Sequence, residues 1–278
     1  MTININTADE EFQQQIIQAY QNGMSLRQIQ NNFNVNRQTT AHFLEKRKIK
    51  TTKGNHHRTY NHNENFFENI DTEQKAYWLG FMFADGYISN NDNRYGQDQF
   101  GISLAEQDIE LLYKFKTAIN ATNPIHTYYR KEGTPGQPMC RIFLTSQKTV
   151  NDLISHGCVK QKSHILQPPI GVPEELIPHF IRGFFDGDGS ISKYKQSEDK
   201  NIYLINFTTT KDMAIWLKNY FKKGSVYKEK RREHTFYYSL GGHLQIIKFY
   251  HMLYDNASVY LQRKKDRFEE LTQKYSEN

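Results

Sequence analysis

Cysteine, proline and long apolar runs are scarce in this chain of 278 residues, which has two cysteines and seven prolines. The cysteines are Cys140 and Cys158, too few for a disulfide framework or for a zinc site built from four thiolates. No stretch reaches the roughly 20 consecutive apolar residues that cross a membrane. The first residues also lack the basic and apolar regions of a signal peptide. We therefore expect a soluble protein with reduced thiols.

The charge and the aromatic content of the chain indicate what kind of protein it is. The formal net charge is +6, which favours a polyanionic partner, although many soluble proteins carry a similar excess. Aromatic residues make up 14% of the chain, a content that is typical of a packed core rather than of disorder. The length is sufficient for one large domain or for two.

Two stretches of the chain share one pattern: Trp78–Gly86 (WLGFMFADG) and Ile181–Gly189 (IRGFFDGDG). Each is an apolar run in which small residues recur four positions apart, on one face of a helix. These small residues are Gly80 and Ala84 in the first stretch and Gly183 and Gly187 in the second. Small side chains allow two helix backbones to approach closely, so the pattern predicts two helices packed against each other.

Both stretches end in Asp-Gly. Gly86 and Gly189 suit the left-handed conformation that often ends a helix. Asp85 and Asp188 are then expected at helix C-termini, where the helix dipole disfavours an anion. If the helices pack side by side, the two carboxylates also repel each other. Two anions held together in this way indicate a divalent cation between them.

The paired stretches resemble the signature of the LAGLIDADG homing endonucleases. The eighth motif residue, which is the catalytic acid in that family, falls on Asp85 and Asp188, and the glycine of the helix interface falls on Gly80 and Gly183. One departure is the sixth position, which is Phe83 in the first copy and Asp186 in the second, and which is not the metal ligand in the family pattern. The resemblance implies a double-motif protein that cuts both DNA strands across the minor groove of a long specific site, leaving 3′ overhangs.

The chemistry of the two aspartates is consistent with this resemblance. Phosphodiester hydrolysis requires an activated water, a stabilised leaving oxygen and neutralisation of charge on phosphorus, which carboxylates holding Mg²⁺ supply. Mg²⁺ prefers oxygen ligands, so Asp85 and Asp188 are predicted metal ligands as well as catalytic residues. The family also places basic residues near the scissile phosphates, and Lys162 and Lys264 are the candidates here. Ordinary phosphate contacts or a solvated helix face explain these two lysines equally well.

After Asp71 the chain runs twice through the same pattern of elements. The hydrophobic periodicity predicts two αββαββα units, residues 72–168 and 169–278, each with an antiparallel sheet. The resemblance implies that the two units are pseudo-symmetric and that their sheets are saddle-like. The fold class is therefore α+β. One face of each sheet should pack on helices and the other should be open to solvent.

Basic residues and tyrosines alternate along the predicted strands. On the open faces they suit a ribbon inserted into a DNA groove, although charge there often serves only solvation. The predicted DNA contacts are Arg130, Arg141, Lys193, Lys195, Lys228, Lys230 and Arg232.

Residues 1–50 precede the duplicated part and predict a small all-α helix-turn-helix domain. Ser25 and Asn36 are expected N-caps, and Asn34 is expected in the left-handed turn conformation. The third helix is predicted to present its polar face to a major groove. The residues on that face are Arg37, Gln38, Thr39, His42 and Arg47. A three-helix bundle with a solvated basic face is the alternative.

Residues 51–71 are predicted to be a basic linker along DNA phosphates, and a histidine-rich zinc site there is much less favoured by the spacing. Together these features predict a monomeric, Mg²⁺-dependent, site-specific endonuclease that binds double-stranded DNA, in the cytoplasm or associated with the nucleoid. The competing class is a non-cleaving DNA-binding regulator or an RNA maturase on the same scaffold. A pure binder has no need of two opposed carboxylates, which favours catalysis.

Overall fold

The computed structural model describes residues 2–49, 51, 60–89, 98–129, 136–195 and 201–276. The chain forms two compact units, Met1–Asn61 and His62–Asn278. In the part of the chain that is described, no helix has the length and apolar character needed to cross a bilayer.

The N-terminal unit contains three helices, α1 (Glu10–Gln21), α2 (Leu26–Phe33) and α3 (Arg37–Lys46). The expected caps are confirmed: Ser25 forms a capping box with Gln28, and the Asn36 side chain accepts from the backbone at the start of α3. Asn34 has φ 52°, the left-handed conformation predicted for the turn. Ile16, Ile29 and Phe43 are buried between the helices.

The second unit runs twice through the predicted order of elements. The first repeat consists of α4 (Glu73–Ala84), β1 (Gly86–Ser89), β2 (Gln99–Ala105), α5 (Ile109–Ala118), β3 (His126–Tyr129), β4 (Pro138–Thr145) and α6 (Gln147–Ser155). The second consists of α7 (Ile177–Asp188), β5 (Gly189–Lys195), β6 (Asn201–Thr209), α8 (Lys211–Phe221), β7 (Ser225–Lys228), β8 (Phe236–Gly241) and α9 (His243–Tyr254). Short 3₁₀ turns η1 (Glu106–Asp108), η2 (Lys162–His164) and η3 (Glu174–Leu176) lie between them, and α10 (Gln262–Ser276) follows.

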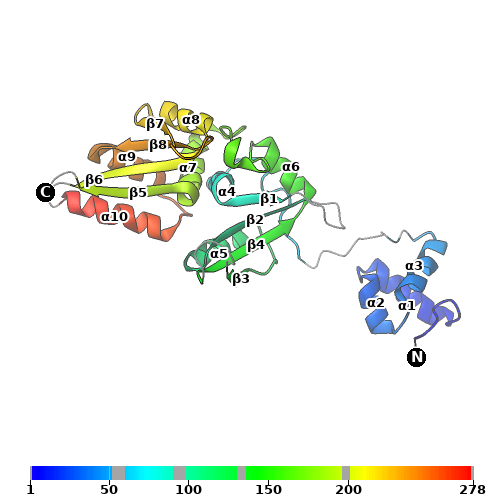
Figure 1. Cartoon of the computed structure of the whole chain (residues 1–278). Coiled ribbons are helices and arrows are strands. Elements are labelled where there is room, and N and C mark those ends of the chain that lie inside the picture. Colours follow the sequence, from blue (N-terminus) through cyan, green and yellow to red (C-terminus); the bar gives the residue numbers. More distant parts are fainter. Residues whose placement is uncertain are drawn as a thin grey trace. The chain divides into compact units, whose positions relative to one another are not determined.

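Each repeat builds one antiparallel four-stranded sheet (Figure 1). The strand orders are β1-β2-β4-β3 and β5-β6-β8-β7, so the two sheets share one topology. This confirms the predicted α+β fold of two αββαββα units. Alternate strand residues such as Ile102, Ile142 and Ile205 are fully buried in one continuous core shared with the helices. The opposite face of each sheet is the open face.

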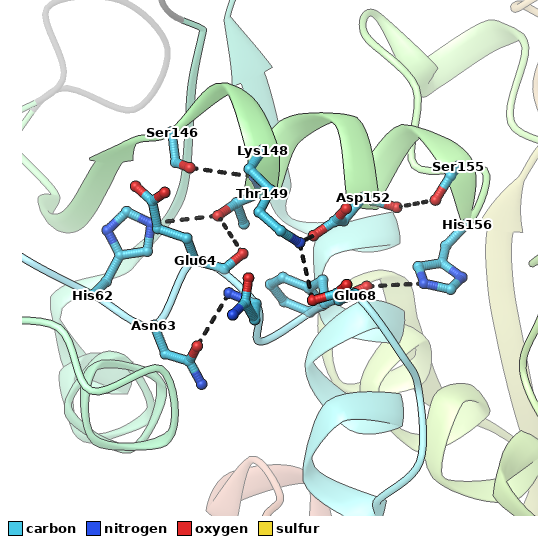
Figure 2. A network of polar contacts seen from close by, with 12 residues as sticks. His62, Asn63, Glu64, Glu68, Ser146, Lys148, Thr149, Asp152, Ser155 and His156 are labelled. Atoms are coloured by element: carbon cyan, nitrogen blue, oxygen red, sulfur yellow. Dashed lines mark hydrogen bonds and ion pairs between the residues drawn. The ribbon is translucent and has the colours of Figure 1, made fainter.

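Residues 62–71 are not a linker, contrary to the sequence-based prediction. Phe67 is fully buried in the core of the second unit, and neighbouring polar groups bind α6 (Figure 2). Thr149 donates to the carbonyl of Glu64, and the ring nitrogens of His156 lie 2.9 Å from the Phe67 carbonyl and 2.8 Å from that of Ile170. The aromatic residues, rather than the basic ones, determine where this segment lies.

Two of the basic residues that were expected on strands lie beyond one, because β7 ends at Lys228. The carboxylate of Glu229 accepts from the Arg231 backbone and from the Tyr237 hydroxyl, and the Glu229 N–H donates to Thr235 at 2.8 Å. These local bonds turn the chain, so Lys230 and Arg232 lie in the β7–β8 connection rather than on a strand.

Candidate active site

Helices α4 and α7 cross at the centre of the second unit with their backbones in contact. A Cβ at Gly80 would lie 2.0 Å from the Phe180 carbonyl oxygen, and one at Gly183 would lie 1.9 Å from that of Tyr77. One turn further along, a Cβ at Gly187 would lie 2.2 Å from that of Ala84. No side chain fits at the three glycines, so these glycines and Ala84 line the helix crossing as the sequence pattern predicts.

The crossing places the two motif aspartates at neighbouring helix ends. Asp85 is the C-cap residue of α4, and Asp188 is the last residue of α7. Desolvation raises the pKa of Asp85, which the Lys264 and Lys162 ammonium groups oppose. Desolvation first, and then the charge of Asp85, raise the pKa of Asp188 to about 7. Both side chains are exposed to solvent, although the protein around them desolvates the carboxylates in part.

Gly86 and Gly189 do not adopt the left-handed conformation expected for them. Gly189 has φ −79°, Gly86 has no positive φ, and both begin strands. A Cβ at Gly189 would lie 2.0 Å from the Phe185 ring, and one at Gly86 would lie 2.6 Å from Met82. Glycine is required here because the strand leaves the helix so closely that a side chain would strike the preceding turn.

Lys162 and Lys264 occupy equivalent places in the two repeats. Each donates to the carbonyl of the glycine that follows a motif aspartate, Lys162 to Gly86 and Lys264 to Gly189. Their surroundings differ, because Lys162 is half-buried whereas Lys264 is buried and also donates to Phe185 at 2.5 Å and Gly187 at 3.3 Å. Desolvation lowers the pKa of Lys264 to about 8.

A buried polar network, which was not identified from the sequence, favours the charged form of Lys264 through the carboxylate of Asp186. Asp186, at the sixth motif position, is fully buried and accepts from the Tyr77 hydroxyl at 2.8 Å, the Tyr254 hydroxyl at 2.6 Å and the Leu261 N–H at 2.7 Å. These donors come from α4, α9 and the segment before α10, so one carboxylate connects distant parts of the chain. A carboxylate within an apolar motif helix was the available sequence signal.

A cavity of about 410 Å³ opens beside Asp188, and Lys162, Arg232 and Thr209 are among the residues that line it. The Thr209 hydroxyl is buried and has no hydrogen-bond partner among the described residues. Buried hydroxyls are usually paired, so this one is available to a bound group.

The metal expected from the sequence requires oxygen donors. Among the described residues, no group of three or more His, Cys, Asp or Glu side chains could hold an ion. Asp85 and Asp188 offer two carboxylates whose mutual repulsion a cation would relieve, and the Gly86 and Gly189 carbonyls already accept from lysines. The donor set fits a hard divalent cation that takes its other ligands from water and substrate phosphates.

The structure places one of the two arginines of the first sheet that were predicted to contact DNA. Arg141 is exposed and pairs in register with Ser103 and His126 on the open face, as predicted. Arg130 lies outside the described residues.

The expected face is wrong for three lysines of the second sheet. Lys193 pairs with Tyr203, which is part of the core, and Lys195 shares its side of β5. Lys228 pairs with Phe236, which packs against the same core. All three side chains are exposed, and they lie on β5 and β7, the edge strands of the sheet.

In the N-terminal unit, Arg37, Gln38 and His42 are exposed on α3, and Thr39 is half-buried. Arg47 is exposed but held by its own domain, because it donates to Gln13 at 2.6 Å and lies 3.7 Å from the Phe43 ring centroid.

No protein-family model and no curated protein matches the sequence. Solved structures do match. Meganuclease I-SmaMI bound to uncleavable DNA with a TTCT central four is 16% identical over 71% of this chain and 88% of its own, with a TM-score of 0.51. The LAGLIDADG homing endonuclease I-GzeII in complex with its DNA target is also 16% identical, over 71% and 88%, with a TM-score of 0.50. At this identity the likeness concerns the fold: the chain has the fold of a double-motif LAGLIDADG homing endonuclease.

Proposed function

We propose that this protein is a monomeric, site-specific DNA endonuclease that hydrolyses one phosphodiester in each strand of a duplex. The observation that carries the proposal is the pair Asp85 and Asp188, brought together by backbone contact between α4 and α7. A binding protein gains nothing from two opposed carboxylates whose pKa values are raised. The fold shared with I-SmaMI and I-GzeII supports the same class of reaction.

In this proposal, Mg²⁺ bound by Asp85 and Asp188 would polarise the phosphate and lower the pKa of the attacking water. The protein contributes the placement of the two carboxylates. Because each comes from one repeat, one chain presents an acid to each strand of a pseudo-symmetric duplex.

The two lysines would neutralise negative charge near the reacting phosphates. Lys162 donates to one described carbonyl and is half-buried, so its ammonium group can also reach a phosphate oxygen. Lys264 uses its N–H groups on three carbonyls, so it acts on the same site through its charge. The free hydroxyl of Thr209 and the side chain of Arg232 line the same cavity and suit a neighbouring phosphate.

DNA binding is assigned to the open faces of the two sheets and, as a separate contact, to the exposed face of α3. Binding is expected to weaken steeply with salt, because lysines and arginines replace counterions on the phosphates.

Incubation of a randomised or host-genomic DNA library with the protein and Mg²⁺, with the ends mapped by sequencing, tests the proposal. We expect staggered ends at a single long motif, and no cleavage by Asp85→Asn or Asp188→Asn, although both variants still bind. Undiminished cutting by both variants would refute the assigned site. Enrichment of a bound motif without any cleavage would instead support the regulator or maturase class.

A further inference from the structure

The open faces of the two sheets differ in charge. Among the described strands of the first sheet, the open face carries Arg141 on β4. The open face of the second sheet alternates in register through Ser190 and Ser192 on β5, Asn206 and Thr208 on β6, and Tyr237 and Ser239 on β8. None of these side chains is charged. If both faces meet DNA, they cannot read the same kind of base edge.

Arg141 is positioned by aromatic rings and not by an acid. Its guanidinium carbon lies 5.0 Å from the centroid of the Tyr128 ring and 5.8 Å from that of Phe143. Tyr128, on β3, is itself fixed, because its hydroxyl lies 2.7 Å from that of Ser103 on β2, on the far side of β4. Among the described residues, no carboxylate forms an ion pair with Arg141. These ring contacts, rather than an ion pair, hold the guanidinium, whose planar N–H groups can bind two acceptors at once.

The position of Arg141 favours a base over a phosphate. Strand β4 is an inner strand, bonded to β2 on one side and β3 on the other (Figure 1). Arg141 and the rings of Tyr128 and Phe143 line a cavity of about 360 Å³ on this face. A side chain at the middle of a sheet that enters a groove points at base edges, whereas phosphates lie along the rims. Guanine presents O6 and N7 to the major groove, the acceptor pair that arginine binds most often.

We infer that Arg141 reads a guanine in the half of the target that the first repeat contacts, and that this contact determines specificity at that position. Among the described strands of the second sheet, no arginine lies on the open face, where Asn206 and hydroxyl groups offer weaker discrimination between bases. Asn206 is already engaged within the sheet, because its amide accepts from Ser239 and its Nδ2 lies 3.4 Å from Ser192. The inference rests on the proposed DNA-binding function and adds a prediction about the sequence of the target.

Selection of bound duplexes from a random DNA pool by the full chain, with EDTA present to prevent cleavage, tests the inference. We expect one strongly preferred guanine in one half of the enriched motif. Arg141→Ala should remove the preference at that position alone, and binding to the wild-type motif should weaken by roughly 5- to 150-fold. The salt dependence of binding should stay nearly unchanged, since no phosphate contact is lost.

Lys193→Ala is the matched control, because it removes an exposed cation from the helix-covered face of the second sheet. It should leave the sequence of the motif unchanged. A uniform loss of affinity for all sequences in Arg141→Ala, with a shallower salt slope, would show a phosphate contact and overturn the inference. An unchanged motif would overturn it too. If the wild-type chain enriches no motif, the proposed function itself fails, which is a different result from a motif that does not depend on Arg141.

Discussion

Replacement of Asp188 by asparagine should stabilise the protein at pH 8, although it removes a proposed metal ligand. Desolvation and the neighbouring Asp85 raise the pKa of Asp188 from 3.8 to about 7. A rise of this size corresponds to about 4 kcal/mol when each pH unit counts 1.36 kcal/mol. Because the side chain is exposed, solvent screening reduces the expected effect to about 1–2 kcal/mol.

The sign follows from proton binding. The native protein keeps the Asp188 proton up to about pH 7, whereas the unfolded chain releases it near pH 3.8. Between these values the native state binds more protons, so the free energy of unfolding of the wild type decreases as pH rises through this window. The asparagine side chain of the variant does not titrate and avoids this loss.

Urea unfolding in EDTA at a series of pH values between 4 and 8 measures the difference directly. Asp188→Asn should exceed the wild type by about 1–2 kcal/mol at pH 8, and the gain should shrink toward zero as pH approaches 4. Glu110→Gln removes the same charge from an exposed position on α5 and should show no such trend. A variant that is no more stable than the wild type at pH 8, or a gain independent of pH, would refute the reasoning. Added Mg²⁺ should stabilise only the wild type, because a ligand that binds only the native state raises its stability.

Three further substitutions test the packing. Gly183→Ala places a methyl group 1.9 Å from the Tyr77 carbonyl oxygen, so α4 and α7 must separate at a cost of about 3 kcal/mol; an unchanged urea midpoint would contradict the contact. Lys264→Met leaves Asp186 buried without its cation and should lower the free energy of unfolding by about 3 kcal/mol. The double variant with Asp186→Asn should lose less than the sum of the two single losses, whereas strictly additive losses would argue against coupling between these residues. Asn36→Ala removes the acceptor at the start of α3 and should lower the stability of the N-terminal unit by about 1 kcal/mol; calorimetry that shows no shift would argue against the cap.

The features that follow from local sequence could be predicted well. Small residues four positions apart indicate the α4–α7 crossing, and the caps at Ser25 and Asn36 indicate the starts of α2 and α3. Asp85 and Asp188 fall in one site because each ends such a helix. Periodicity is also sufficient for the order of strands and helices in both repeats.

Features that depend on distant partners or on exact register could not be predicted. The network of Asp186 depends on Tyr254 and Leu261, which lie far along the chain and are brought near only by the fold. The charge of Lys193 favours the open face, but strand alternation from buried Gly189 places it on the other face. Dihedral freedom would account for the glycine at position 189, whereas the actual reason is the nearby Phe185 ring.

The docking of residues 62–70 on α6 has a consequence for the proposed binding of both units to one DNA molecule. Since His62 is already anchored to the second unit, the N-terminal unit is joined through about a dozen residues after Ile49, which reach at most about 45 Å. Once one unit holds DNA, the other meets the neighbouring base pairs at an effective concentration in the millimolar range. Even weak intrinsic affinity of α3 for DNA would then suffice.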